Sequence, residues 1–209
     1  MDLQTLLTFI AASTILSLAP GPDNIFVLIQ SALYGPRAGI FITLGLCTGL
    51  IVHTTAVAMG IAAIFLVSKT AFTVLKSVGA LYLLYLAWLA FRAQASQLEV
   101  HENQPVKTHA LYRRGIIMNL SNPKVAIFFL AFLPQFADPN TGQMSFQLFK
   151  LGLIFIAVAL TVFSSIAWLA GFLTRKMQQS PKIQEVMNKC AAAIFVALAV
   201  KLATSSNQA

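Results

Sequence analysis

Charged residues are scarce in this sequence, and acidic residues are the scarcest of them. Of its 209 residues only 10% are charged, with 6 Asp and Glu against 14 Lys and Arg, while 58% are hydrophobic. A soluble globular domain has about 25% charged and about 45–50% apolar residues. The shortage of charge excludes a disordered chain and most soluble enzymes, and it favours a protein embedded in a membrane.

Cysteine and histidine are also rare. The two cysteines, Cys47 and Cys190, lie inside apolar stretches, which excludes a disulfide-stapled secreted domain and predicts buried, inert thiols. His101 and His109 have no accompanying acids or cysteines with which to bind a metal. We therefore expect no metal site, no cofactor and no catalytic residues.

The net charge of +8 does not indicate a nucleic-acid-binding protein, because the basic residues fall mostly at the ends of apolar runs. The positive-inside rule accounts for them better. If the chain crosses the membrane six times, nine basic residues flank one side and four the other. The nine-cation side is predicted to be cytoplasmic, which places both termini outside the cytoplasm.

Long apolar runs predict an all-α integral membrane protein with six spans. Six spans at roughly 20 residues each need about 120 residues within the hydrocarbon, which this length allows. A polar stretch over 92–114 is predicted to be a flexible cytoplasmic connector between a first three-helix repeat, 1–91, and a second, 115–209. The spans are expected at about 3–33, 38–67, 72–91, 116–136, 148–174 and 186–203.

Each half has a proline-containing break in its first span, at Pro20-Gly21-Pro22 and at Ser121-Asn122-Pro123-Lys124. Three spans per half is an odd number, so two repeated halves must have opposite orientations in the membrane. The predicted fold is thus a 3+3 inverted repeat with broken first and fourth helices.

The breaks are the first candidates for a binding site. A proline frees backbone groups that lipid cannot satisfy, so a break persists only where protein or a water-lined cavity receives it. Asn122 before Pro123 is typical of a helix N-cap, and Gly21 before Pro22 resembles the same arrangement with a weaker cap. Each break therefore presents a helix N-terminus, which can hold a carboxylate.

Asp23 and Lys124 occupy matching places just after the two prolines, and we expect these opposite charges to meet at the centre. In a structural interpretation, Asp23 completes its own helix cap and pairs with Lys124. In a functional one, a zwitterion places its ammonium on Asp23 and freed carbonyls, and its carboxylate on Lys124 and helix amides. An acid at this depth could also exchange a proton. Both interpretations stay open.

Four other residues within the spans are candidates for helix packing or for lining a cavity. Gly45 and Gly49 are spaced to let a neighbouring helix approach closely. His53 is expected to form a hydrogen bond within the bundle, with a direct functional role as the alternative. Tyr82 is expected at the membrane interface, or otherwise in a cavity.

Four segments together resemble the LysE/RhtB family of bacterial amino-acid exporters, over nearly the whole chain. They are Ser17–Asn24, Gly45-xxx-Gly49, Gly79–Leu83 and Asn119–Lys124. The resemblance implies a multi-pass protein of the bacterial cytoplasmic membrane that exports amino acids or related metabolites, in exchange for protons, and is not an enzyme. Carried onto this chain, the site residues are Pro20, Gly21, Pro22, Asp23, Asn24, Asn119, Asn122, Pro123 and Lys124.

Two details qualify the resemblance. Some members have an acid directly after the second glycine of the Gly-xxx-Gly motif, where this chain has Leu50, so a coupling role for that acid does not transfer. The segment Thr48–His53 is more similar to the homoserine/threonine-exporter branch. The implied partners are a small zwitterionic amino acid, protons and the lipid bilayer, with a homo-oligomer left open.

Two alternatives remain at this point. One is a membrane thiol–disulfide relay that uses Cys47 and Cys190, although these lie in non-equivalent spans. The other is a metal-ion exporter or channel, for which only Asp23 and His53 offer ligands at depth.

Overall fold

Every regular element that the computed structural model describes is a helix. The described residues are 2–19, 21–61, 69–92, 107–138, 142–179 and 181–204. The α-helices are α1 (Leu3–Leu18), α2 (Pro22–Tyr34), α3 (Pro36–Ala56), α5 (Lys69–Arg92), α6 (Thr108–Leu120), α7 (Pro123–Ile127), α8 (Met144–Gln179) and α9 (Pro181–Thr204). Two π-helical turns, η1 (Val57–Ile61) and η2 (Phe128–Phe132), and a 3₁₀ turn, η3 (Leu133–Phe136), complete them.

Both predicted breaks are confirmed. The axes of α1 and α2 are bent by 60°, and those of α6 and the segment Pro123–Phe136 by 51°. Proline stands at the start of α2 and of α7, where its missing N–H costs no helical hydrogen bond. Within the described residues, Pro36–Gly60 and Met144–Ala170 are long and apolar enough to cross a membrane, and each bent pair could form one further span.

One predicted boundary is wrong. The polar connector was expected to extend to Arg114, but α6 begins at Thr108. The reason is packing: Leu111 and Gly115 are buried on the face of α6 that meets α3, so this stretch is held as helix despite its polar composition. Residues 93–106 of the expected connector, and 62–67 of the second span, lie outside the described residues.

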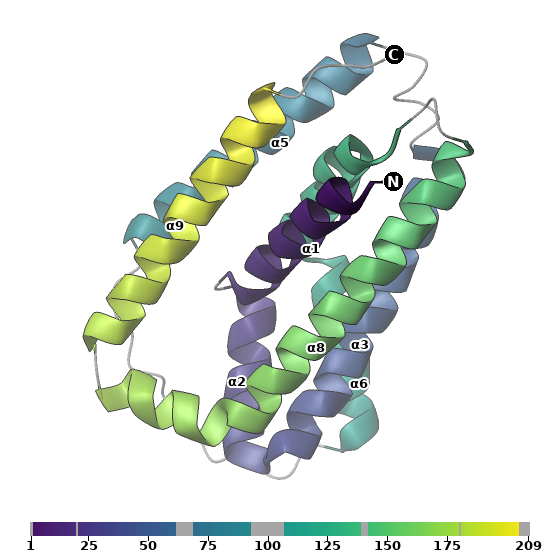
Figure 1. Cartoon of the computed structure of the whole chain (residues 1–209). Helices are drawn as coiled ribbons and strands as arrows, with labels where there is room; N and C mark the ends of the chain where they lie inside the picture. Colours follow the sequence, from purple (N-terminus) through teal and green to yellow (C-terminus); the bar gives the residue numbers. More distant parts are fainter. Residues whose placement is uncertain are drawn as a thin grey trace.

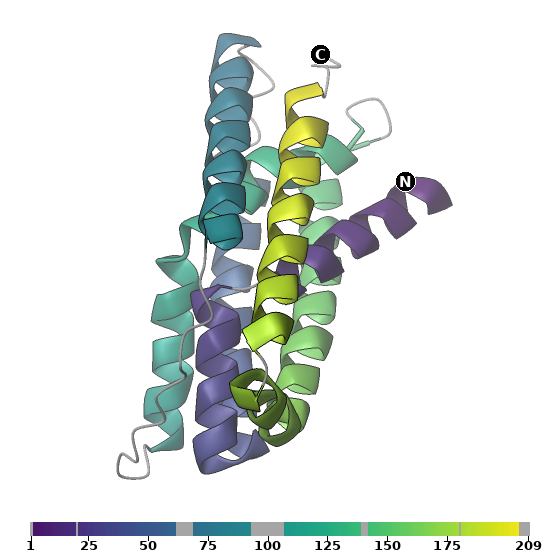
Figure 2. The same ribbon diagram turned by 90° about the vertical axis from the view of Figure 1, so that its left-hand side faces the viewer.

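The helices pack as a bundle in which α1 and α2 lie between the α5–α9 pair and the helices α3 and α8 (Figure 1). α3 contacts both α6 and α8, α8 also contacts α1 and α2, and α5 pairs with α9 along one side (Figures 1 and 2). A Cβ on Gly45 would collide with the backbone of Tyr112, and one on Gly49 would lie 2.6 Å from Asn119 Oδ1. At both glycines the helix that approaches closely is α6.

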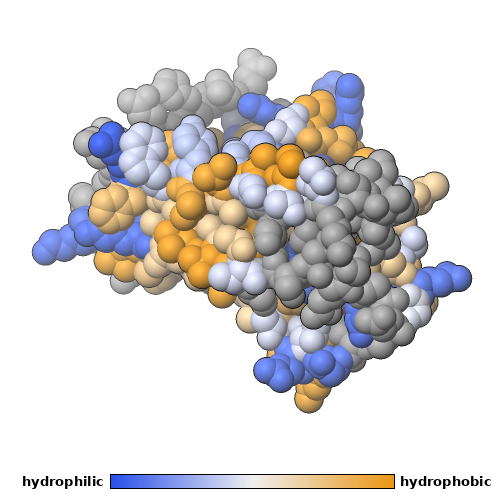
Figure 3. All heavy atoms as spheres, turned by 90° about the horizontal axis from the view of Figure 1, so that it is seen from above, coloured by the Kyte–Doolittle hydropathy of each residue, from blue (hydrophilic) through white to orange (hydrophobic). Residues whose placement is uncertain are grey.

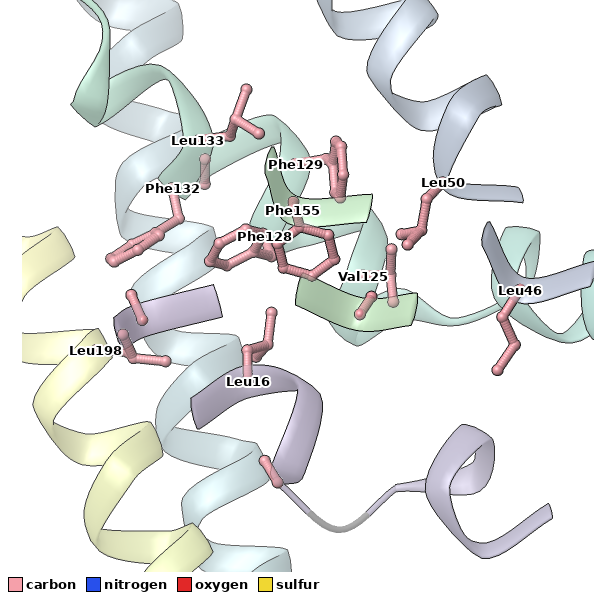
Figure 4. Packing of buried hydrophobic residues seen from close by; sticks show 14 of the residues in the cluster. Leu16, Leu46, Leu50, Val125, Phe128, Phe129, Phe132, Leu133, Phe155 and Leu198 are labelled. Carbon is pink, nitrogen blue, oxygen red and sulfur yellow. The ribbon is translucent and has the colours of Figure 1, made fainter. Parts of the chain in front are cut away.

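A cluster of phenylalanines fixes the chain just after the second break. Phe128 in η2 lies 5.0 Å from Phe155 of α8, centroid to centroid (Figure 4). Its ring is also 6.4 Å from that of Phe9 of α1. Such aromatic pairs contribute about 0.5–1.5 kcal/mol each beyond their buried area. The cluster therefore holds the second broken helix against both α1 and α8.

The outer faces are apolar. Trp168 of α8 is 71% exposed and Leu81 of α5 is 67% exposed. Exposed apolar surface of this kind is typical of contact with lipid. Viewed from above, hydrophilic side chains project around the outline of the molecule (Figure 3). At the end of α5 the Arg92 guanidinium lies 4.6 Å from the Trp88 ring, a pairing suited to the membrane interface.

Candidate functional site

The two breaks lie side by side at mid-height in the bundle (Figures 1 and 2). Five polar residues gather there, and we call them the break cluster: Asp23, Asn24, Asn119, Asn122 and Lys124. All five are buried, Asp23 to 1% exposed and Lys124 to 6%. Ionisable groups at such depth are costly and usually functional, so the cluster is the candidate site.

Asn122 joins the two breaks through the two ends of its side-chain amide. Its Oδ1 accepts a hydrogen bond of 3.0 Å from the backbone N–H of Lys124, which caps α7 as predicted. Its Nδ2 donates a 2.8 Å hydrogen bond to Oδ2 of Asp23, which lies 99 positions earlier in the chain. One amide therefore terminates the second break and holds the acid of the first.

Lys124 reaches across to the end of α1. Its ammonium Nζ donates to the carbonyl oxygen of Ala19 at 3.2 Å and to that of Leu16 at 3.4 Å. The last carbonyls of a helix have no partner within it and carry the negative end of the helix dipole. Lys124 thus caps the C-terminus of a helix in the other half of the molecule.

The expected pair of Asp23 and Lys124 is only partly realised. Both charges lie in the break cluster, but the described residues contain no ion pair between them within 4.0 Å. The physical reason is that each charge has another partner, Asn122 for the acid and the α1 carbonyls for the base. Nor does Asp23 cap its own helix: the N-cap of α2 is Gly21, with no side-chain cap.

Several buried acceptors of the cluster have no hydrogen-bond partner among the described residues. They are Asp23 Oδ1, Asn24 Oδ1 and Asn119 Oδ1. Asn24 is nevertheless fixed, because its Nδ2 donates to the carbonyl of Ser17 at 2.6 Å. Buried polar atoms are satisfied in most proteins, so such a group of acceptors indicates a place for a donor such as an ammonium or a water.

The sequence-based prediction missed the hydroxyl groups beside the first break. Ser13 and Ser17 are buried on one face of α1, and neither hydroxyl has a partner among the described residues. By contrast, Thr14 on the same helix donates to the carbonyl four residues earlier at 2.8 Å. The signal was present in the spacing, because two serines four residues apart share one helix face.

His53 is held within the bundle. Its Nε2 lies 3.4 Å from the carbonyl oxygen of Asn119, and its ring is 5.7 Å from that of Phe129. The contact connects α3 to the last turn before the second break. Tyr82 lies half-buried on α5, with its ring 6.1 Å from that of the exposed Tyr85. Pro20 falls outside the described residues.

The thiol relay finds no support in the geometry. Cys47 is free and buried on α3, as predicted, whereas Cys190 is free and exposed on α9, contrary to the expectation that both are buried. The reason is that α9 turns this part of its apolar surface outward. Among the described residues no three His, Cys, Asp or Glu side chains come together as a metal site would require.

Comparison with known proteins gives matches along nearly the whole chain. The family described as LysE type translocator matches residues 14–206. An uncharacterized membrane protein of Vibrio cholerae is 32% identical over 205 residues, covering 98% of this chain and 99% of that protein. The homoserine/homoserine lactone efflux protein of Salmonella typhimurium is 32% identical over 206 residues, covering 98% of each. No solved structure gives a significant match.

Proposed function

Since the chain belongs to the family of LysE type translocators, we propose that it exports small amino acids or related metabolites across the bacterial cytoplasmic membrane in exchange for protons. A translocator is a transporter and not an enzyme, and the chain is a multi-pass membrane protein. The Salmonella relative bears the name of a homoserine and homoserine lactone efflux protein, which supports homoserine-like substrates here. The observation that carries the proposal is the buried break cluster.

The six-span inverted repeat is part of this proposal. Its support is that the helix contacts of the two halves correspond. The second span of the first half, α3, packs on α6 of the second half, and the equivalent helix α8 packs on α1 and α2 of the first half. When the halves are swapped, α3 takes the place of α8 and α5 takes the place of α9. The contacts between α3 and α8 and between α5 and α9 are therefore preserved. With three spans in each half, such a swap requires opposite orientations in the membrane.

Orientation follows from the loop charges. Six crossings return the chain to its starting side, and α1 begins and α9 ends toward the same end of the bundle (Figure 1). We assign that end to the outside, because nine basic residues flank the other side and four flank this one. The proposed arrangement requires only one chain, and a homo-oligomer is left open, as in the sequence analysis.

In the proposed site the two breaks bind opposite ends of a zwitterion. Asp23 Oδ1 and Asn24 Oδ1 are acceptors with no partner among the described residues, so they suit an ammonium. The Lys124 ammonium suits a carboxylate. The bends at the two breaks give the halves separate helix segments that can move as access alternates.

Asp23 also supports the coupling to protons. It is the one acid among the five residues of the break cluster, and a carboxylate can hold either a substrate ammonium or a proton. If the two compete for the same oxygens, release of one permits binding of the other. Antiport then needs no separate proton site.

The test is transport in inverted membrane vesicles, in which export appears as uptake. We expect radiolabelled homoserine or threonine to accumulate when the vesicle interior is acid, and accumulation to collapse when the pH gradient is dissipated. Asp23→Asn should abolish uptake, whereas the control Glu185→Gln, which alters an exposed acid on α9, should not. Uptake that is unaffected by the gradient would remove the antiport claim.

A further inference from the structure

The end of α1 forms a seat for a primary ammonium, and Lys124 fills it. The seat consists of the carbonyl oxygens of Leu16 and Ala19, at 3.4 and 3.2 Å from Lys124 Nζ. Charge-assisted hydrogen bonds between N–H and O are usually about 2.7–2.9 Å. The lysine is therefore held by the negative end of the helix through two long contacts, which a better-placed ammonium can replace.

Gly21 is what gives the lysine room. A Cβ on Gly21 would lie 3.1 Å from Lys124 Nζ and 3.7 Å from its Cε. The backbone at Gly21 is extended, with φ −173°, so any residue could adopt it. A side chain at this position would press on the ammonium and shift it, so glycine leaves free the space that the ammonium occupies.

The first break offers more acceptors than Lys124 uses. Asp23 Oδ1 and Asn24 Oδ1 belong to the same break, and neither has a partner among the described residues; the same is true of the Ser17 hydroxyl. An ammonium has three N–H donors, and Lys124 is hydrogen-bonded here to two carbonyls. A free ammonium, unlike one tethered to α7, is not restricted to the two carbonyls.

We propose that Lys124 is a tethered stand-in for the ammonium of the substrate. In the substrate-free state it neutralises the α1 carbonyl seat; when a substrate ammonium enters, Lys124 leaves the seat and binds the carboxylate of the same molecule. This inference rests on the proposed function and names its substrate class. A displaced Lys124 is a buried cation that needs a counter-charge, so the site selects zwitterionic amino acids over simple amines.

The first test removes the Lys124 side chain and supplies a free ammonium compound in its place. In purified Lys124→Ala, ethylammonium should enter the seat and raise Tm by about 5 °C at about ten times its dissociation constant. Ethanol, a neutral molecule of similar size, should not. Wild type and Lys124→Arg, which keep a cation in the seat, should show no rise with ethylammonium. An equal response to the amine in wild type and Lys124→Ala would overturn the proposal.

The second test needs no variant and decides the matter if Lys124→Ala does not stay folded. Homoserine and its decarboxylated counterpart, 3-aminopropan-1-ol, are compared for binding to the wild type by their shifts of Tm. We expect the amine to bind at least 100-fold more weakly, and equal binding would overturn the stand-in role. If no amino acid is bound or transported by the wild type, the proposed function fails, whereas the ethylammonium response of Lys124→Ala would still report the seat.

Discussion

The two broken helices solve the same local problem in different ways. At the second break, the N-cap residue Asn122 uses its own side chain to satisfy α7. At the first break the N-cap is Gly21, which has no side chain to offer, and the carbonyls at the end of α1 are satisfied by Lys124. The second break is therefore locally complete, whereas the first depends on residues of the other half.

This difference gives the site a polarity. The side-chain donors that cross between the breaks, Asn122 Nδ2 and Lys124 Nζ, come from the second break, and the groups that accept them come from the first. A zwitterion between them meets acceptors on one side and donors on the other. The asymmetry of the two breaks thus has the chemistry that an amino-acid site requires.

Replacing Asn122 should have the largest effect, because it serves both breaks. In Asn122→Leu the α7 cap is lost, at about 1 kcal/mol, and a hydrogen bond to a buried carboxylate is lost, at about 1–3 kcal/mol. We expect export to be abolished and the protein to be destabilised by about 2–4 kcal/mol. Unfolding in detergent and vesicle transport measure the two effects.

Asn122→Ser separates the two tasks of this residue. A serine hydroxyl is a good N-cap but is too short to take the place of the amide donor to Asp23. The variant should recover the stability of the cap while transport stays low. Full transport in Asn122→Ser would mean that the link between the breaks is dispensable.

The breaks themselves were predictable from the sequence, and their contacts were not. A proline preceded by asparagine or glycine acts through local chemistry, so the starts of α2 and α7 could be read from a few residues. The target of Lys124 lies more than 100 residues away and depends on how α1 and α7 cross. Opposite charges suggested an ion pair, but the free carbonyls of a broken helix compete for the lysine.

The helix boundaries show the same limit. Composition predicted a polar connector up to Arg114, yet α6 begins at Thr108 because Leu111 and Gly115 pack on α3. The π-helical turns η1 and η2 were also not predicted, since hydrophobic periodicity does not separate a π-turn from an α-helix over five residues. Tertiary packing decided each of these features.

Asp23→Asn tests the acceptor side of the site, which belongs to the first break. The change keeps the size of the side chain and removes its charge, so we expect transport to fall at least 100-fold with little loss of folded protein. The expected reason is loss of both the ammonium partner and the proton carrier. Counterflow, an exchange of labelled for unlabelled substrate that needs no gradient, should fail as well; intact counterflow would assign Asp23 to proton coupling alone.

The two prolines should differ in importance. Pro123→Ala lifts the restriction that keeps Asn122 out of helical geometry, so α6 and α7 can join into a straighter helix. Pro22→Ala leaves Gly21, itself a poor helix former, and the first break should persist. We expect transport to fall about tenfold in Pro123→Ala and no more than about twofold in Pro22→Ala, measured as initial rates. Equal effects would contradict the idea that the breaks are held differently.

The smallest effect is expected at Ser17, beside the first break. Its buried hydroxyl has no partner among the described residues, so Ser17→Ala should not destabilise the protein and can stabilise it by up to about 1 kcal/mol. If the hydroxyl contributes to the ammonium seat, the apparent KM for substrate should rise about threefold while the maximal rate is unchanged. Thr14→Val, which removes a hydroxyl already bonded to Ile10, is the matched control and should leave KM unchanged. An unchanged KM in Ser17→Ala would mean that the Ser17 hydroxyl takes no part in binding the substrate ammonium.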